Sequence, residues 1–427
     1  MRDNAPVPSD RGLLCLTILD DNPFVRTPAG TIHPRAATFH RFAETIVREG
    51  PFERARYLVP VRDATGADAS PALPPIDTRW LRVVPTAPFE GAAGFLSRAP
   101  SLTRANRPLV RAAVRSADLV WMKVPASNAP LAAILAALHQ VPRFTYVAGR
   151  ALEVVRGQGR AGPASAAALA AAAAYDLVTS LLRATGPSVT LDQTLFTSTL
   201  TADEMAPVSP HREPPGPGEP WRIGWAGRMA AEKGLGDLLS AFSLLRTDAR
   251  DAQLHLIGDG PVRAALEQEA DRLGLTGSIR WHGYLGDRAT YFDALRSLDL
   301  FCLPSHAEGV PKALIDALGA GVPVVATDVG RVRALLDDGE LGLVISPGDP
   351  AAIAGAMSIL MDDPARWARL REAGLASAVD RTAEAQARRL IGWMERTFPR
   401  SGWEEAWAVR ATLDGRAGDR ERGGFAA

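Results

Sequence analysis

The chain has 427 residues, more than one ordinary hydrophobic core accommodates, so its length predicts two domains. Lys and Arg together number 48, as do Asp and Glu, and the formal net charge of zero excludes a global field that would draw nucleic acid or an anionic membrane to the whole surface. The two cysteines, Cys15 and Cys302, lie in apolar runs, which predicts buried thiols in a reducing compartment rather than a disulfide framework.

The first twelve residues do not resemble a signal peptide. They contain two Asp, two Arg and two Pro rather than a net basic stretch, and the apolar run that follows ends after seven residues at Asp20 and Asp21. Every apolar run in the sequence is shorter than the roughly 18 residues that cross a bilayer. We therefore expect a cytoplasmic protein, in which any contact with the inner membrane face is peripheral.

The first half of the chain alternates short apolar runs with amphipathic stretches, as βαβ units do. Strands are expected at 13–19, 55–61, 81–85, 118–124, 143–149 and 175–180, and helices at 37–49, 129–140 and 164–175. The second half alternates more regularly. Its strands are expected at 221–227, 252–258, 278–285, 300–305 and 323–327, with a helix after each of the first four, and the segments 342–348 and 350–361 follow the last.

A stretch dense in proline and glycine, residues 207–220, predicts a linker because it lacks amide donors and has fixed φ angles. It separates an N-terminal domain, 1–206, from a second domain, 221–380, and residues 381–427 are expected to form a final helix and a tail that is mobile past about Leu413. The predicted fold is α/β, with two Rossmann-like doubly wound parallel-sheet domains facing a central cleft.

The second domain opens with a pattern suited to an anion. A strand ends at Gly227, Arg228 and Lys233 follow five residues apart, and Gly234 begins a helix. Glycine lets the backbone approach a ligand closely, and a helix N-terminus offers free amides and partial positive charge. Together with the two cations this predicts a diphosphate site, the alternative being a solvated charge cluster at an ordinary helix start.

Two further turns are expected at the same edge of the sheet. The segment Gly-Asp-Gly-Pro, with Gly258 and Gly260, follows the second strand and is weak evidence alone. After the fourth strand, Glu308 precedes a tight helix entry, and Asp316 projects from the second turn of that helix. A surface ion pair between Lys312 and Asp316 is the alternative for the second acid.

These segments resemble a known family. Residues 227–234, 258–261, 304–330 and 342–357 are similar, in order and spacing, to the donor-binding domain of retaining glycosyltransferases of family 4, or glycosyl transferases group 1, which have the two-domain GT-B fold. The resemblance implies a nucleotide-diphosphate sugar donor, a UDP- or GDP-sugar first of all, a saccharide or lipid-linked acceptor for the N-terminal domain, and a role in polysaccharide or glycoconjugate synthesis. It implies no metal, no other cofactor and no nucleic-acid partner.

The resemblance also implies roles for individual residues. Arg228 and Lys233 would hold the diphosphate, and Glu308 would contact hydroxyls of the donor sugar; these three are the predicted catalytic residues. Asp316 would contact the nucleotide ribose, in place of a glutamate that is usual in the family. The predicted donor-binding residues are Gly227, Gly258, Gly260, Gly309, Val310, Pro311 and Asp316.

The first half matches the family poorly, because the loop after the first strand offers a single glycine and two acids. Asp20, Asp21, Gly30 and His33 are the candidates for acceptor binding, with capping of turns as the alternative for the two acids. A stripe of arginines spaced three, four and four residues apart forms one face of a predicted helix: Arg104, Arg107, Arg111 and Arg115. This stripe is either solvated or contacts an anionic membrane or a lipid diphosphate acceptor.

Two other functions stay open at this point. A nucleotide-sugar epimerase could use the same scaffold, and it would need acid and base groups in the cleft. A non-catalytic protein that keeps the fold is the second alternative, favoured by Asp316 and by the altered N-terminal loop and opposed by Arg228, Lys233 and Glu308.

Overall fold

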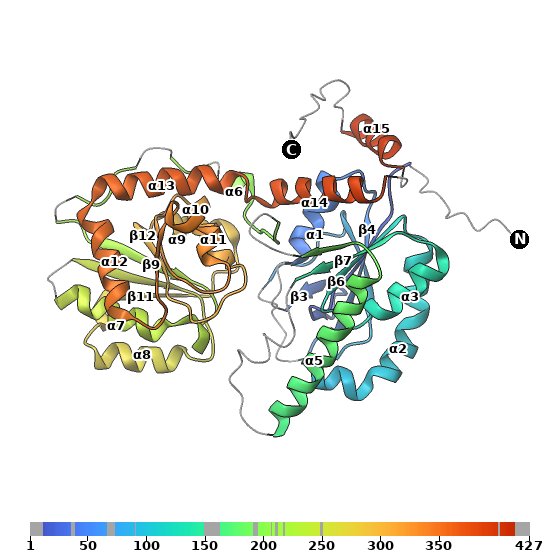
Figure 1. The fold of residues 1–427 in the computed structure, drawn as a ribbon. Helices are drawn as coiled ribbons and strands as arrows, with labels where there is room; N and C mark the ends of the chain where they lie inside the picture. Colours follow the sequence, from blue (N-terminus) through green and yellow to red (C-terminus); the bar gives the residue numbers. More distant parts are fainter. Residues whose placement is uncertain are drawn as a thin grey trace, which may run out of the picture. The chain divides into compact units, whose positions relative to one another are not determined.

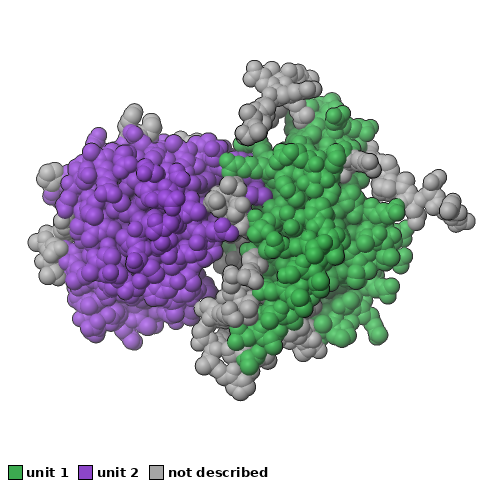
Figure 2. All heavy atoms as spheres, in the orientation of Figure 1, with its two compact units in different colours: residues 1–191, 387–427 green, residues 192–386 purple. Residues whose placement is uncertain are grey.

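The protein divides into two compact units. The computed structural model describes residues 12–35, 39–65, 73–89, 91–148, 163–190, 195–205, 207–209, 212–216, 218–247, 251–399 and 402–414. Unit 1 comprises residues 1–191 and 387–427, and unit 2 comprises residues 192–386 (Figure 2). The chain therefore passes between the units twice, and each unit is described by itself below.

The division differs from the boundaries expected from composition, because the predicted linker at 207–220 lies within unit 2. Arg212 in this stretch donates hydrogen bonds to the main-chain carbonyls of Arg296 (3.0 Å) and Leu298 (2.7 Å). The described part of the stretch is thus anchored on unit 2. A high content of proline and glycine indicates that a segment lacks regular structure. It does not indicate a linker, because an irregular segment can still pack closely on a domain.

The C-terminal segment returns to unit 1 from residue 387 onward. Helix α14 (Ala383–Thr397) and helix α15 (Trp403–Leu413) are the last elements of the described chain, and the predicted mobile tail past residue 414 lies outside the described residues. Aromatic rings attach these helices: the Trp393 ring centroid lies 5.3 Å from that of Phe144, and that of Trp403 lies 5.7 Å from that of Phe52.

Unit 1 is built around one sheet. In chain order its elements are β1 (Leu16–Leu19), β2 (Phe24–Arg26), β3 (Ile32–Pro34), α1 (Phe39–Glu49), β4 (Ala55–Asp63), β5 (Leu81–Thr86), α2 (Gly91–Arg115), β6 (Leu119–Val124), α3 (Ala129–His139), β7 (Arg143–Val147), α5 (Pro163–Ala184) and β8 (Ser188–Thr190). Among the described residues, eight strands form the sheet in the order β3-β2-β4-β1-β6-β7-β8, with β5 paired to β4. All pairings are parallel except that of β2 with β3.

Helices cover both faces of this sheet (Figure 1). Buried residues of α2, α3 and α5 form one apolar cluster with Leu19, Val120 and Met122 of the strands. On the other face, Phe39 and Phe42 of α1 contact the ring of Trp121. Alternate residues of β6 thus face opposite layers, which is the arrangement expected of a doubly wound sheet.

The predicted strand at 175–180 is wrong, because these residues belong to α5. The alanine-rich run before them favours helix, and the first glycine after them is Gly186. Val178 and Leu182, four residues apart, both pack on the cluster under α2 and α3. Helical spacing of these contacts outweighs the strand preference of Val178 and Thr179.

Unit 2 is a second α/β layer structure with short strands. Its elements are α6 (Ala202–Met205), β9 (Trp221–Ala226), a 3-10 turn (Ala231–Lys233), α7 (Leu235–Thr247), β10 (Ala252–Ile257), α8 (Arg263–Arg272), β11 (Ile279–Gly283), α9 (Arg288–Arg296), β12 (Leu300–Leu303), α10 (Lys312–Gly319), β13 (Val324–Thr327), α11 (Val332–Leu335), β14 (Leu343–Ile345), α12 (Pro350–Asp362) and α13 (Pro364–Val379). In the described part of the unit, six strands pair in the order β11-β10-β9-β12-β13-β14. Every pairing is parallel.

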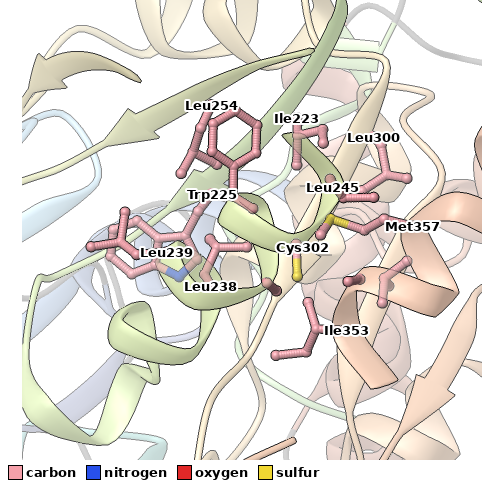
Figure 3. Close-up of a cluster of buried hydrophobic side chains, with 14 of the residues drawn as sticks. Ile223, Trp225, Leu238, Leu239, Leu245, Leu254, Leu300, Cys302, Ile353 and Met357 are labelled. Carbon is pink, nitrogen blue, oxygen red and sulfur yellow. The ribbon is translucent and has the colours of Figure 1, made fainter. Parts of the chain in front are cut away.

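Apolar side chains fill both faces of this sheet. On one face, Ile223 and Trp225 of β9 meet leucines of α7 and residues of α12 such as Ile353 and Met357 (Figure 3). Cys302 lies in the same cluster, and burial raises the pKa of its thiol. Both cysteines are buried, as predicted. In the described residues of the two units, no helix is long and apolar enough to cross a bilayer.

Candidate functional site

The predicted donor-site residues follow neighbouring strands of unit 2. Strands β10, β9, β12 and β13 are adjacent and parallel, so the loops after them lie at one edge of the sheet. The strand order runs from β9 to β10 and β11 in one direction and from β12 to β14 in the other. The point between β9 and β12 is therefore a topological switch point, where open α/β sheets bind ligands.

Two glycines let the loops at this edge pack closely. Gly258 has a φ of +136°, and a Cβ there would lie 1.8 Å from the carbonyl oxygen of Gly227. Gly234 has a φ of +64°, and its Cβ would lie 2.0 Å from the carbonyl oxygen of Pro304. Any side chain would push the loops apart, so both glycines are required by the close approach of the loops after β9, β10 and β12.

The centre of the site is an ion pair across the switch point. Lys233 ends the 3-10 turn after β9, and its Nζ lies 2.8 Å from Oε1 of Glu308, in the loop after β12. The side chains are 23% and 8% exposed. Ser305 Oγ donates a second hydrogen bond of 2.7 Å to the same carboxylate oxygen. Two predicted catalytic residues, 75 positions apart in sequence, are thus in direct contact.

Arg228, the third predicted catalytic residue, does not join this pair. Its side chain is 69% exposed, and its Nη2 lies 3.2 Å from Oε1 of Glu232. Exposed pairs of this spacing contribute only about 0.3 to 0.5 kcal/mol. The guanidinium can therefore exchange Glu232 for a ligand anion at small cost.

Sequence reasoning missed a second pair at the same edge. His306 Nε2 lies 2.6 Å from Oδ2 of Asp237 in α7, and the main-chain amide of His306 donates to the carbonyl of Glu232 at 2.9 Å. These contacts tie the loop after β12 to the start of α7. They join residues 69 positions apart, and the local sequence pattern carries no signal of them.

The remaining predicted donor-site residues shape the entry to α10. Pro311 is buried and has an extended backbone at the N-cap position. Val310 packs against a buried apolar cluster that includes Leu303 and Leu314. Gly260 packs against the loop after β9, since a Cβ there would lie 2.2 Å from the carbonyl oxygen of Met229. Gly309 differs, because an added Cβ would meet no described atom within 4 Å.

Asp316 is buried and forms an ion pair with an arginine of another helix. It is 4% exposed, and its Oδ2 lies 3.3 Å from Nη1 of Arg288 in α9. Arg288 also contacts Glu204 of α6, with Nε 2.7 Å from the carboxylate. Burial raises the pKa of Asp316, although Arg288 opposes this shift. The carboxylate expected at the ribose, or in a surface pair with Lys312, has the partly buried guanidinium of Arg288 as a partner.

The two acids after β1 lie at the carboxyl edge of the unit 1 sheet. Burial would raise the pKa of Asp20, but Lys123 at 2.5 Å and a hydrogen bond from the Tyr57 hydroxyl hold it below its ordinary value. Asp21 accepts hydrogen bonds from the amide (2.5 Å) and hydroxyl (2.9 Å) of Ser127. Burial nevertheless raises the pKa of Asp21 to about 7. Adjacent carboxyls with divergent pKa values are frequent at functional sites.

Gly30 and His33, the other acceptor-side candidates, belong to the β2–β3 hairpin. Gly30 closes its turn, with an amide donating to the carbonyl of Thr27 at 2.9 Å. The His33 ring contacts the Thr31 hydroxyl (3.0 Å) and the carbonyl of Leu73 (2.8 Å). Neither contact involves Asp20 or Asp21, so the four candidates form two groups.

The arginine stripe forms an open, basic face of α2. Its four members are exposed and line a shallow groove of about 500 Å³. Among the residues that the structure describes, none makes an ion pair with these four guanidinium groups. The face is therefore charged and without a protein counter-charge in the described chain.

Comparison with known proteins finds a family match within unit 2. The family model for glycosyl transferases group 1 matches residues 220–363. Over 149 residues the chain is 33% identical to the alpha-D-kanosaminyltransferase of Streptomyces kanamyceticus, covering 35% of this chain and 38% of that protein. It is 30% identical over 177 residues to a glycogen synthase of Mycobacterium tuberculosis, covering 41% and 42%. The chain spans about two fifths of the length of these curated relatives.

Solved structures show the same fold over nearly the whole chain. Sucrose-phosphate synthase from Thermosynechococcus elongatus aligns with a TM-score of 0.61 at 17% identity, covering 90% of this chain and 99% of that one. HepE of Anabaena, in complex with UDP and glucose, aligns with a TM-score of 0.59 at 16% identity, covering 90% and 100%. Residues 220–363 therefore match the glycosyl transferases group 1 family, and the chain has the GT-B fold of two Rossmann-like α/β units.

Proposed function

We propose that the protein is a retaining glycosyltransferase that moves a hexose from a nucleotide-diphosphate sugar to a hydroxyl group of a saccharide, glycolipid or other acceptor. The observation that carries this proposal is the contact of Lys233 with Glu308 at the switch point of unit 2. A lysine is suited to bind phosphate, and a carboxylate beside it is suited to accept hydrogen bonds from sugar hydroxyls, which supports the proposal. The match of residues 220–363 to a glycosyltransferase family supports the same assignment.

The proposed chemistry depends on stabilising the leaving group. The bond between the anomeric carbon and the β-phosphate oxygen breaks, and the acceptor oxygen bonds to the anomeric carbon from the same face. The acceptor proton passes to the departing phosphate oxygen. Lys233 and Arg228 offset the charge that grows on the diphosphate, and Glu308 orients the sugar through its hydroxyls. These roles need no metal and no other cofactor, so a chelator should leave the rate unchanged.

We propose a UDP-sugar, or next a GDP-sugar, as donor. HepE, which shares the fold, has been solved with UDP-glucose, and a phosphatidyl-myo-inositol mannosyltransferase of Mycobacterium leprae is 36% identical over 150 residues, covering 35% of this chain and 39% of that protein. Products of such transfers are glycoconjugates or polysaccharides, and we propose a cell-surface product of this kind.

Nucleotide binding tests the proposal first. In a thermal-shift panel of UDP, GDP, ADP and their sugars, a nucleotide at a hundred times its dissociation constant should stabilise the protein by about 2.7 kcal/mol. Analysis of products with the binding sugar nucleotide then separates transfer to an acceptor from epimerisation of the free nucleotide sugar. A protein that responds to none of these compounds would instead be a non-catalytic member of the fold.

We further propose that unit 1 contacts an anionic membrane through the arginine stripe of α2. Helices α3 and α5, which pack beside α2, expose Ile134, Leu138, Leu177 and Leu181, so apolar and basic groups are both available. At low salt, vesicles containing phosphatidylglycerol should retain the protein. Arg107→Ser with Arg111→Ser should reduce this retention several-fold, whereas Arg369→Ser with Arg388→Ser, on other helices, should not. Equal retention of both double variants would contradict the assignment.

A further inference from the structure

A pocket in unit 1 has a chemistry that the proposed site in unit 2 does not use. It has a volume of about 420 Å³, within the range of small-molecule sites. Three arginines line it, Arg35, Arg62 and Arg98, together with apolar residues that include Phe24, Pro60 and Phe89. The pocket thus combines a basic rim with an apolar wall.

The three arginines come from separate parts of the chain. Arg35 follows β3, Arg62 lies near the end of β4, and Arg98 lies in α2. Folding therefore brings together cations that are 27 and 36 residues apart in sequence. Arg62 donates to the carbonyl of Asp63 at 3.2 Å. This convergence differs from the stripe on α2, where one helix repeats arginine at its own spacing.

The described residues that line the pocket are basic, apolar or glycine, and none of them is Asp or Glu. Within the described chain, the guanidinium groups of Arg35 and Arg98 have no ion-pair partner. Like charges gathered around one cavity repel each other, and a bound anion would offset this repulsion with charge-assisted hydrogen bonds.

Part of the pocket lining lies at the carboxyl edge of the unit 1 sheet. Strands β1 and β4 are parallel neighbours with Leu19 paired to Leu58, so Asp20 and Asp21 lie level with the segment of β4 that leads to Pro60. Pro60 and Arg62 near the end of β4, and Phe89 after β5, contribute to the pocket. The carboxyl ends of parallel strands are the usual ligand position in this fold class.

We propose that this pocket binds the phosphoryl or carboxylate group of an anionic acceptor, with the apolar wall contacting the part of the acceptor next to that group. The proposal depends on the proposed transferase function only in identifying the bound molecule as the acceptor. Binding of the anion itself depends on the three arginines. A soluble sugar phosphate and a phospholipid headgroup present the same chemistry.

Phenyl phosphate is a suitable probe because it joins a phosphoryl group to an apolar ring. Its dissociation constant, measured by calorimetry on the full chain, should rise about tenfold in Arg35→Gln and in Arg98→Gln, since each variant loses one charge-assisted hydrogen bond. Both side chains are exposed, so the fold should tolerate the changes. Arg82→Gln is the matched control, because Arg82 is exposed at the amino end of β5, remote from the pocket in the strand register.

Several outcomes decide the proposal. Phenyl phosphate that binds no better than phenyl glucoside, or that binds Arg35→Gln and wild type equally, would show that these arginines are merely solvated. Glucose 1-phosphate and dihexanoyl phosphatidic acid, titrated separately, show whether the sugar or the lipid source binds more tightly. Thermal shifts with nucleotides, measured on the same variants, test ligand binding by unit 2 independently of the pocket. If phenyl phosphate bound and no nucleotide gave a thermal shift, the proposed transferase function would be contradicted and the anion pocket would not.

Discussion

Replacing Lys233 with alanine is expected to lower kcat/KM for sugar transfer by about a hundredfold or more. Lys233 is the cation that lies at the switch point beside Glu308, where a diphosphate leaving group would gain charge in the transition state. Removing one such stabilising group costs about two to three orders of magnitude in other enzymes. The measurement is transfer rate with the nucleotide sugar that the thermal-shift panel identifies.

Two companion variants separate this catalytic role from a structural one. Lys233→Ala also leaves the carboxylate of Glu308, which is 8% exposed, without its cation, so part of the loss could come from a displaced Glu308. Arg228→Ala carries no such cost, because Arg228 is 69% exposed and its ion-pair partner in the described part of the chain is Glu232. It should lose activity to a similar degree with an unchanged melting temperature. Arg272→Ala, an exposed paired arginine on α8, should change neither quantity.

Near wild-type transfer by both Lys233→Ala and Arg228→Ala would remove the diphosphate role. A second result would be equally informative. If Lys233→Ala with Glu308→Gln were more active than Lys233→Ala alone, the pair would be needed mainly to neutralise Glu308. Independent roles for the two side chains predict that the double variant is the least active.

The fold of unit 2 could be predicted because its signals are local. Each expected strand from 221 to 327 overlaps one of β9 to β13, since short apolar runs alternate there with amphipathic helices. The fold of unit 1 was harder to predict from the sequence. The hairpin of β2 and β3 lies in a segment with prolines at 23, 28 and 34, which resembles a loop. Its pairing with β4 depends on tertiary context that the segment does not contain.

In the candidate site, too, contacts that depend on tertiary packing could not be predicted from the local sequence. Lys233 and Glu308 could be expected to lie close together, because both follow strands of one parallel sheet. The pair of Asp237 with His306 depends on how α7 packs beside the loop after β12, and nothing in either local pattern encodes it. The family resemblance implied a contact of Asp316 with the ribose, and its own helix suggested Lys312 as the alternative partner. Its partner, Arg288, comes from a different helix 28 residues earlier.

Asp316→Ala is expected to lower the free energy of unfolding by about 2 to 4 kcal/mol. The substitution removes the carboxylate that contacts Arg288 in the interior, and it leaves that guanidinium with Glu204 as its remaining acidic partner. Breaking a buried pair on one side costs more than the pair contributes, because an incompletely compensated charge stays behind. Chemical denaturation of the full chain measures the change. Asp293→Ala, in an exposed pair on α9, should cost less than about 1 kcal/mol.

Asp316→Asn distinguishes packing from ligand contact, because the amide keeps the size of the side chain and an acceptor oxygen for Arg288. Its loss of stability should be smaller than that of Asp316→Ala, and the KM for the donor should stay unchanged. Burial raises the pKa of Asp316 above its ordinary value of 3.8. The folded state therefore holds the proton more tightly than the unfolded state, and the free energy of unfolding falls as pH rises from 3.8 through the raised pKa. Asn cannot ionise, and the variant should lack that pH dependence. A raised donor KM with wild-type stability would instead mean that Asp316 reaches the nucleotide.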